Sequence, residues 1–246
     1  MNPAQREPLM NTSIKPSPAT SNRLRKTSVT IATGDADLEG ELNLPDSTVG
    51  VVIFAHGSGS SRYSPRNQYV ASQFREAGLG TLLFDLLTYE EGDEDAFTGK
   101  LRFDIDLLAS RLVAVSQWLY KQAGLGSMKV GYFGASTGAA AALIAAAELG
   151  GRISAVVSRG GRPDLAGDAL NSVCAPTLLI VGGLDSMVIN LNEDAYAKLR
   201  CEKSFRLVAG ATHLFEEPGK LEQVAQLSTE WFSRHMGLRR KWEELA

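Results

Sequence analysis

The sequence contains little that would mark a specialised class of protein. Only two of its 246 residues are cysteines, Cys174 and Cys201, and their spacing fits neither a metal site nor a disulfide framework. We therefore expect two buried, reduced thiols and a cytoplasmic location. The longest apolar run, residues 139–147, is about half of what a membrane helix needs and is mostly alanine, so no membrane association is expected.

An excess of charge is also missing. The formal net charge is -3, and the lysines and arginines form no long basic stripe, which argues against a nucleic-acid partner. The apolar fraction of 44% and the charged fraction of 22% are typical of an ordinary soluble globular protein. The most plausible partner is therefore a small molecule, and the composition predicts no particular oligomeric state.

The chain divides into a polar start and one folded domain. Four of the nine prolines lie before residue 19, among Asn, Ser and Thr, and such a mixture cannot bury enough apolar surface to become ordered. We predict a flexible tail over residues 1–24 and a single domain over residues 25–246. The tail is rich in Ser and Thr and has one acidic residue, which leaves a targeting role open.

The hydrophobic pattern of the domain predicts an α/β fold. Residues 27–44 alternate between polar and apolar around a turn signal at 33–35, which is typical of an antiparallel hairpin. Later apolar runs are short, continuous and rich in Val, Ile and Leu, as in strands buried on both faces of a parallel sheet. We expect these strands at 49–54, 80–84, 128–133, 153–157, 177–181 and 205–208.

Between the strands, apolar residues recur at helical spacing. This alternation predicts an open, mostly parallel sheet with right-handed crossovers and helices on both faces. Residues 159–176 hold at most a short helix, so no separate cap domain is expected. The acidic segment 86–95 is expected to be a solvated loop overhanging the site, where its charges would disfavour anionic groups. The predicted helices span about 66–77, 103–122, 137–149, 189–200 and 217–236.

The strongest chemical signal is Gly134-x-Ser136-x-Gly138, between a predicted strand and a predicted helix. This is the nucleophile-elbow pattern, in which a serine stands on a sharp turn that leaves no room for neighbouring side chains. The helix that follows favours a nearby oxyanion through its N-terminus. Ser136 is therefore the candidate nucleophile.

A nucleophilic serine needs a base, and the chain has three histidines. His213 follows the last predicted strand, where the loop end of the sheet would hold it near Ser136. His235 lies late in the final helix, where we expect a surface residue. His56 lies in a glycine-rich loop, which we expect it to brace by hydrogen bonding.

The base in turn needs a carboxylate to fix its tautomer. Asp185 follows a buried strand and two glycines, whereas Glu193 and Asp194 fall within a predicted helix and should face solvent. The chain order Ser136, Asp185, His213 is that of α/β hydrolases.

An oxyanion intermediate needs two backbone donors. We assign one to the Thr137 N–H and the other to Ser58, with Gly57 as the alternative and as a backbone that a substrate can approach closely. Arg159 and Arg162 follow another strand end and could hold a substrate carboxylate by a forked contact.

Four segments together carry a family resemblance: His56-Gly57, the turn around Ser136, Gly-Gly-x-Asp185 and Gly210-x-Thr-His213. Over about residues 27–236 they resemble the dienelactone-hydrolase-like branch of the α/β hydrolases. This resemblance implies an eight-stranded sheet, no cofactor, and hydrolysis of small esters or lactones through an acyl-enzyme. Dienelactone hydrolases proper have cysteine at the position of Ser136, so dienelactone itself is not the expected substrate.

The sequence thus predicts a serine esterase for small, short-acyl esters, although a thioesterase, lactonase or peptidase would use the same residues. A dinucleotide-binding protein is an alternative because Gly131, Gly134 and Gly138 also lie at a strand-to-helix turn, but their spacing is not the nucleotide fingerprint. A second alternative is a non-catalytic binding module on a hydrolase fold.

Overall fold

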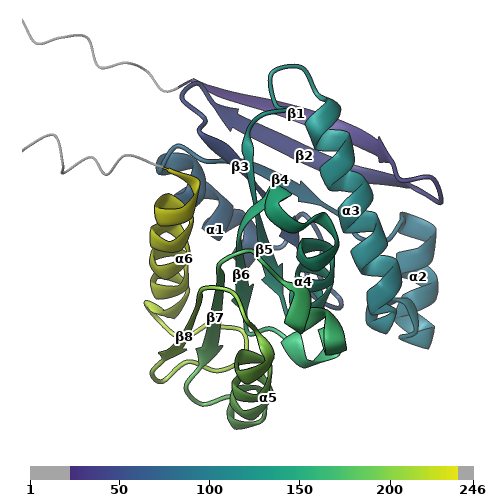
Figure 1. The fold of residues 1–246 in the computed structure, drawn as a ribbon. Coiled ribbons are helices and arrows are strands. Elements are labelled where there is room, and N and C mark those ends of the chain that lie inside the picture. The colour runs from purple at the N-terminus through teal and green to yellow at the C-terminus, as the bar shows by residue number, and fades with distance from the viewer. Residues whose placement is uncertain (1–22, 238–246) are drawn as a thin grey trace, which may run out of the picture.

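The computed structural model describes residues 23–237, and it has an open, eight-stranded sheet at its centre (Figure 1). The strand order is β1-β2-β4-β3-β5-β6-β7-β8. β1 and β2 form the expected antiparallel hairpin, β2 pairs antiparallel with β4, and all other neighbours are parallel. The predicted α/β class is confirmed. The strands are β1 (Leu24–Ala32), β2 (Asp37–Pro45), β3 (Gly50–Ala55), β4 (Gly80–Phe84), β5 (Lys129–Ala135), β6 (Ile153–Arg159), β7 (Thr177–Gly182) and β8 (Lys203–Val208).

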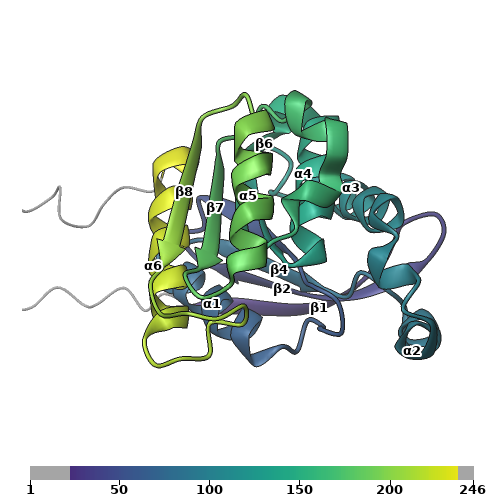
Figure 2. The same ribbon diagram turned by 90° about the horizontal axis from the view of Figure 1, so that it is seen from below.

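Helices cover both faces of the sheet, as Figures 1 and 2 show. Helices α3, α4 and α5 pack on one face, and α1 and α6 pack on the other. The connection from β6 to β7 carries only a 3-10 segment, Pro163–Ser172, as expected for a chain without a separate cap. The predicted tail, residues 1–24, lies almost wholly outside the described residues. The helices are α1 (Pro65–Glu76), α2 (Tyr89–Thr98), α3 (Ile105–Lys121), α4 (Thr137–Leu149), α5 (Ser186–Lys198) and α6 (Lys220–Met236), and a 3-10 turn (Leu101–Phe103) precedes α3.

The two faces of the sheet are packed differently. Four phenylalanines lie between the sheet and helices α1 and α6, with neighbouring ring centroids 5.0–5.7 Å apart: Phe54, Phe74, Phe133 and Phe232. On the opposite face, α4 is almost entirely buried and is built mainly from alanine, so its backbone can approach the strands closely. Each fully buried large side chain contributes roughly 1.5–3 kcal/mol.

The acidic segment after β4 forms helix α2, so the prediction of a loop was wrong. Thr88 Oγ1 accepts a hydrogen bond from the Glu91 N–H at 3.2 Å, and the Glu91 carboxylate accepts one from the Thr88 N–H at 2.8 Å. This reciprocal pair is a capping box, which satisfies two amides at the start of a helix. The spacing Thr-x-x-Glu is visible in the sequence and could have predicted the helix.

Two further expectations, on the burial of the cysteines and on membrane association, can be compared with the structure. Cys174, in the connection before β7, is exposed, and Cys201 is only half-buried. The expectation of two buried thiols was therefore wrong for Cys174 and met only in part for Cys201. Within residues 23–237, no helix combines the length and the apolar character that crossing a membrane requires.

Candidate active site

The candidate residues come from loops that follow parallel strands. Ser58 follows β3, Ser136 follows β5, Asp185 follows β7 and His213 follows β8. Because the carboxyl ends of parallel strands lie at one edge of a sheet, these four loops meet there. The topology therefore gathers the residues that the sequence selects.

Ser136 stands on a strained turn between β5 and α4. Its φ of 50° and ψ of -123° place it in a region that residues other than glycine rarely adopt. A methyl group on Gly134 would lie 2.5 Å from Ala139 Cα, and one on Gly138 would lie 2.2 Å from the Ala55 carbonyl oxygen. Both glycines are therefore required by the close approach of α4 to the sheet.

Backbone hydrogen bonds hold this turn in place. The Ser136 N–H donates to the Arg159 carbonyl oxygen at 3.4 Å, and the Ser136 carbonyl oxygen accepts from the Arg162 N–H at 3.0 Å. The Ser136 hydroxyl makes no hydrogen bond to any residue that the structure describes. It is therefore free to meet a substrate.

Asp185 and His213 are joined directly. The distance between Asp185 Oδ2 and His213 Nδ1 is 2.6 Å. The Asp185 side chain is 15% exposed and that of His213 is 40% exposed, so the imidazole reaches the surface while the carboxylate lies below it. With Nδ1 engaged in this way, Nε2 is the nitrogen available to accept a proton.

The loop that carries His213 is anchored on both sides of the histidine. The Thr212 N–H donates to Glu217 Oε1 at 3.1 Å. The pKa of Glu217 is lowered, mainly by hydrogen bonding with the Thr212 side chain. Phe215 has a φ of 57° and is buried. Sequence reasoning missed both anchors, because neither residue belongs to a recognisable motif.

The end of β6 lies close to both the base and the nucleophile. A methyl group on Gly160 would lie 3.6 Å from His213 Cε1. The residue before it, Arg159, accepts the Ser136 N–H hydrogen bond described above. His213 and Ser136 therefore both lie next to the short stretch of backbone formed by Arg159 and Gly160.

The predicted oxyanion donors also lie together. A methyl group on Gly57 would lie 2.8 Å from Ser136 Cβ, so the glycine-rich loop passes directly over the serine. Ser58 Oγ and Thr137 Oγ1 are 3.2 Å apart. As the first residue of α4, Thr137 has an N–H with no acceptor within the helix.

The other two histidines have different surroundings. His56 Nδ1 donates to the Gly57 carbonyl oxygen at 3.0 Å, and Nε2 accepts from the Leu86 N–H at 3.0 Å, as expected of a residue that braces the loop. Burial lowers the pKa of His56, which favours this neutral form. His235 is half-buried against Trp231, with ring centroids 4.5 Å apart, rather than on the open surface as predicted.

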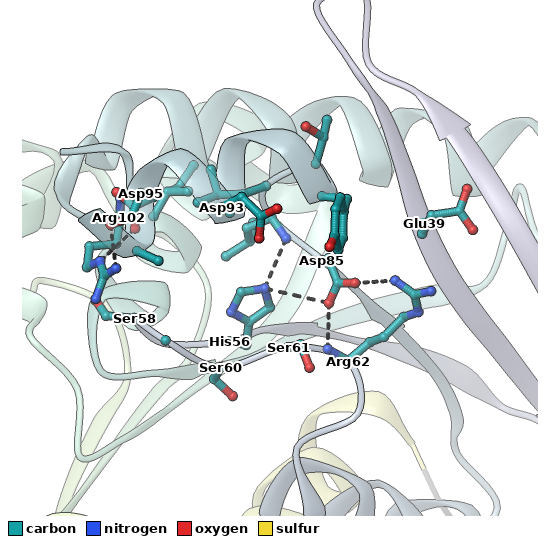
Figure 3. Close-up of a pocket in the computed structure, with 18 of the residues that line it drawn as sticks. Glu39, His56, Ser58, Ser60, Ser61, Arg62, Asp85, Asp93, Asp95 and Arg102 are labelled. Atoms are coloured by element: carbon teal, nitrogen blue, oxygen red, sulfur yellow. Dashed lines mark hydrogen bonds and ion pairs between the residues drawn. The ribbon is translucent and has the colours of Figure 1, made fainter. Parts of the chain in front are cut away.

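A cavity of about 850 Å³ opens beside Ser58 and Thr137 (Figure 3). Its walls come from the loop after β3, the end of β4 and helix α2. Both of its arginines are already paired, because Arg62 binds Asp85 and Arg102 Nε lies 2.6 Å from Asp95 Oδ2. Four further carboxylates on the wall form no ion pair with a described residue: Asp37, Glu39, Glu90 and Asp93. The cavity is therefore negative and disfavours anionic groups.

Neither arginine proposed for a substrate carboxylate lines this cavity. Arg162 is held by Asp164, with Nε and Nη2 at 2.8 and 2.7 Å from the two carboxylate oxygens. Arg159 is only 8% exposed, on the side of the sheet that α1 and α6 cover. Gly57 does line the cavity.

Comparison with solved structures gives matches over most of the chain. A dienelactone hydrolase from Anabaena variabilis is 56% identical to this chain, with a TM-score of 0.85, and the match covers 88% of this chain and 99% of that one. An esterase from Pyrococcus furiosus is 20% identical, with a TM-score of 0.69 and coverage of 87% and 94%. A serine hydrolase homologue from Coxiella burnetii is 18% identical, with a TM-score of 0.67 and coverage of 83% and 96%. The last two similarities concern the fold alone.

Comparison with curated proteins gives relatives of a different length. Two proteins from strains CDC 1551 and H37Rv of Mycobacterium tuberculosis are 56% identical over 213 residues, and both are provisionally named phosphoribosyl transferases. The match covers 87% of this chain but 47% of theirs, so the chain spans about half the length of these relatives. Their name does not have to describe the matched half. No protein-family model matches the chain.

Proposed function

Because the chain belongs to the dienelactone-hydrolase family of α/β hydrolases, we propose that it is a serine hydrolase that cleaves small carboxylic esters with short acyl chains. The observation that carries this proposal is the 2.6 Å contact between Asp185 and His213, at the same sheet edge as a serine with positive φ. A base with its orienting acid, beside an unbonded serine hydroxyl, is the minimal machinery for acyl transfer.

The proposed reaction begins with proton transfer. His213 Nε2 takes the Ser136 hydroxyl proton as Ser136 Oγ attacks the acyl carbon, and Asp185 stabilises the imidazolium that forms. The tetrahedral intermediate then collapses, the alcohol leaves with the proton from His213, and an acyl-enzyme remains. Water, activated by His213, attacks the acyl carbon, and the acid leaves as Ser136 recovers its proton. No step requires a metal or a cofactor.

The intermediate carries a negative oxygen, which we assign to the N–H groups of Ser58 and Thr137. Their side-chain oxygens lie 3.2 Å apart beside the proposed nucleophile, which supports a shared acceptor for the two amides. Removing one such donor typically costs a hundred- to a thousandfold in turnover.

The proposed substrate is a small molecule that reaches the site from the cavity. The cavity is open and has no covering domain, which suits short acyl groups, and its unpaired carboxylates favour neutral or cationic acyl groups over anionic ones. We further propose that the protein acts in the cytoplasm, because both of its cysteines are free thiols. Neither nucleic acid nor a membrane is part of the proposal.

Two other functional classes are less well supported. A dinucleotide-binding protein would leave the bonded pair Asp185 and His213 without a role. A non-catalytic binding module would not need the strain at Ser136, which costs free energy and is usual at active sites.

The experiment that tests the proposal compares wild type with Ser136→Ala on p-nitrophenyl esters from acetate to palmitate. We expect activity on short chains only, and a loss of roughly a millionfold in turnover in the variant. Ser110→Ala, an exposed serine on α3, is the matched control and should behave as wild type. Wild-type activity on thioesters, lactones or peptides instead would change the assigned bond.

A fluorophosphonate probe supplies an independent readout. It should label wild type and Ser110→Ala but not Ser136→Ala, and an unlabelled wild type would support the binding module. Because His213 is the proposed base, His213→Ala should lose activity about as strongly as Ser136→Ala. Near-normal activity in His213→Ala would contradict the assignment of His213.

A further inference from the structure

One charged side chain next to the candidate site has no hydrogen-bond partner among the residues that the structure describes. Arg159 is the last residue of β6 and is 8% exposed. Two of its guanidinium nitrogens, Nε and Nη1, are buried without a hydrogen-bond partner among the described residues. Because a guanidinium stays charged in proteins, its burial is strongly unfavourable unless a counter-ion or a polar ligand accompanies it.

The direction of this side chain follows from the alternation along β6. Ser158 faces α4, since its hydroxyl and Ala139 Cβ both crowd the position of Gly161. Its neighbours therefore face the other way, and Val157 belongs to the apolar layer beneath α1 and α6. Arg159 continues that face at the carboxyl edge of the sheet, where the apolar layer ends.

The apolar layer beneath α1 and α6 also ends at the start of α1. Ser64 precedes this helix without capping it through its side chain, and Pro65 is the first helical residue, so the amides of Arg66 and Asn67 have no acceptor within the helix. Asn67 lies on the buried face of α1 that includes Phe74, and its Oδ1 atom has no partner within residues 23–237. Buried polar atoms without a described partner thus occur both at the end of β6 and at the start of α1.

The charges in this region do not compensate each other. Burial, followed by the positive charge of Arg66, lowers the pKa of Arg159 to about 10, so the two arginines act on each other as like charges. The Glu216 carboxylate is engaged with Arg66, because its Oε1 lies 2.7 Å from Arg66 Nη1. Arg66 Nε nevertheless remains buried and unpartnered in the described structure.

We propose that Arg159, Arg66 and the free amides at the start of α1 form a binding site for a small oxyanion, either a carboxylate or a phosphate group. A guanidinium binds both groups through charge-assisted hydrogen bonds, and an uncapped helix N-terminus favours negative charge. This site explains why a guanidinium is buried here without a protein counter-ion.

The site borders the proposed catalytic residues. The Arg159 carbonyl oxygen accepts the Ser136 N–H hydrogen bond, and Glu216, the partner of Arg66, lies in the loop that also carries His213. The oxyanion could therefore be a group of the substrate or a free anion. The idea that it belongs to the substrate rests on the proposed function. The acidic cavity lined by α2 disfavours such a group, so the two regions would accept different parts of a substrate.

Thermal unfolding in the presence of inorganic phosphate tests the free anion. At constant ionic strength, phosphate should raise the Tm of wild type in a saturable manner, because a ligand that binds only the folded state stabilises it. The increase should disappear in Arg159→Met. The matched control is Arg162→Met, since that guanidinium is already held by Asp164 and its loss should leave the response intact.

A pair of esters tests the substrate as the source. p-Nitrophenyl butyrate and mono-p-nitrophenyl succinate differ mainly in one terminal carboxylate. The ratio of their kcat/KM values, succinate over butyrate, should fall about ten- to a hundredfold in Arg159→Met, as expected for a lost charge-assisted hydrogen bond. The ratio should be unchanged in Arg162→Met.

The outcomes separate the sources. A phosphate response without a change in the ester ratio identifies a free anion, whereas a change in the ratio identifies a group of the substrate. If Arg159→Met does not fold, wild type alone is measured. Calorimetric titration with phosphate and acetate then tests anion binding, and the ratio of the two ester kcat/KM values tests the preference for a carboxylate. No saturable binding and no preference for the succinate ester would overturn the proposal. Fluorophosphonate labelling of Ser136 is measured without these anions, so a failure of the proposed function remains distinguishable.

Discussion

Helices α2 and α4 both border the candidate site, but they are held in opposite ways. In α4 nine of thirteen residues are buried, and most of these are alanines packed between the sheet and α3. In α2 the only buried residue is Asp95, and the aromatic side chains Tyr89 and Phe97 are largely exposed. Packing thus fixes the helix behind the nucleophile, whereas charge fixes the helix over the cavity.

The charges that hold α2 are concentrated at its two ends. Arg111 of α3 is buried and binds Asp35 through Oδ2 at 2.9 Å and Glu91 through both carboxylate oxygens at 2.6 and 2.7 Å. At the other end, Asp95 accepts hydrogen bonds from Arg102 Nε and from the backbone N–H groups of Leu101 and Arg102. The comparison teaches that close packing fixes the position of the nucleophile. The cavity wall is instead held by charged contacts that pH or salt can weaken.

The largest effect should come from adding one methyl group to the packed helix. In Gly138→Ala, the new methyl group would lie 2.2 and 2.4 Å from the carbonyl oxygens of Ala55 and His56, so α4 or β3 must shift. We expect a loss of about 3 kcal/mol in the free energy of unfolding by urea. Turnover should fall roughly a hundredfold, because the Thr137 N–H moves with the helix. A variant with wild-type stability would mean that α4 is not tightly packed.

The next effect should come from the charged anchor. Arg111→Met removes the partner of Asp35 and Glu91, which we expect to cost about 2 kcal/mol, less than for a fully buried pair because both acids can be rehydrated. Hydrogen exchange should rise in α2 far more than in α4. Equal increases in both helices would contradict the idea that Arg111 acts mainly on the cavity wall.

The same contrast explains how much of the fold could be predicted from the sequence. The strands and α4 are recognisable because each consists of a continuous apolar run, and such a run by itself indicates a buried segment. Helix α2 depends on Arg111 and Asp35, which are distant in sequence, so its acidic composition favoured a loop. The capping box of Thr88 and Glu91 was the one local signal, and it was overlooked.

In the candidate site, too, some features could be predicted from local sequence and others depend on distant residues. Ser136, Asp185 and His213 could be selected because each follows a predicted strand in an order typical of one fold. The burial of Arg159 could not be predicted, because it depends on which helices cover the end of β6. The anchoring of the His213 loop by Glu217 depends likewise on a turn whose shape no motif records.

Acid should loosen α2 before the packed core. The hydrogen bond with Arg111 is the main cause that lowers the pKa of Glu91 below its ordinary value of 4.5. For Asp95, burial raises the pKa, but the hydrogen bonds from Arg102 and Leu101 outweigh it and leave the value below 3.8. Acids with lowered pKa values stabilise the fold above their ordinary pKa, and this stabilisation is lost as the pH falls through the folded value.

Hydrogen exchange as a function of pH, corrected for the intrinsic rate, measures this loss. Protection of α2 should decrease below about pH 4.5 while that of α4 persists. Glu91→Gln should remove part of this pH dependence, and Glu90→Gln, its exposed neighbour without an ion pair, should keep it. Simultaneous loss in both helices would show that the charged ends do not set the stability of α2.

The smallest expected effect is a gain in stability rather than a loss. It tests the contrast between α2 and α4 most directly. Gly92 lies inside α2, and a methyl group placed on it would meet no atom within 4 Å. Gly92→Ala should therefore gain only the difference in helix propensity, roughly 0.5–1 kcal/mol, seen as stronger protection of α2 in hydrogen exchange. The same exchange of glycine for alanine is destabilising at Gly138, also inside a helix, so the pair isolates packing from propensity. If Gly92→Ala instead weakened α2, this helix would have to pack against the domain more closely than its exposed side chains indicate.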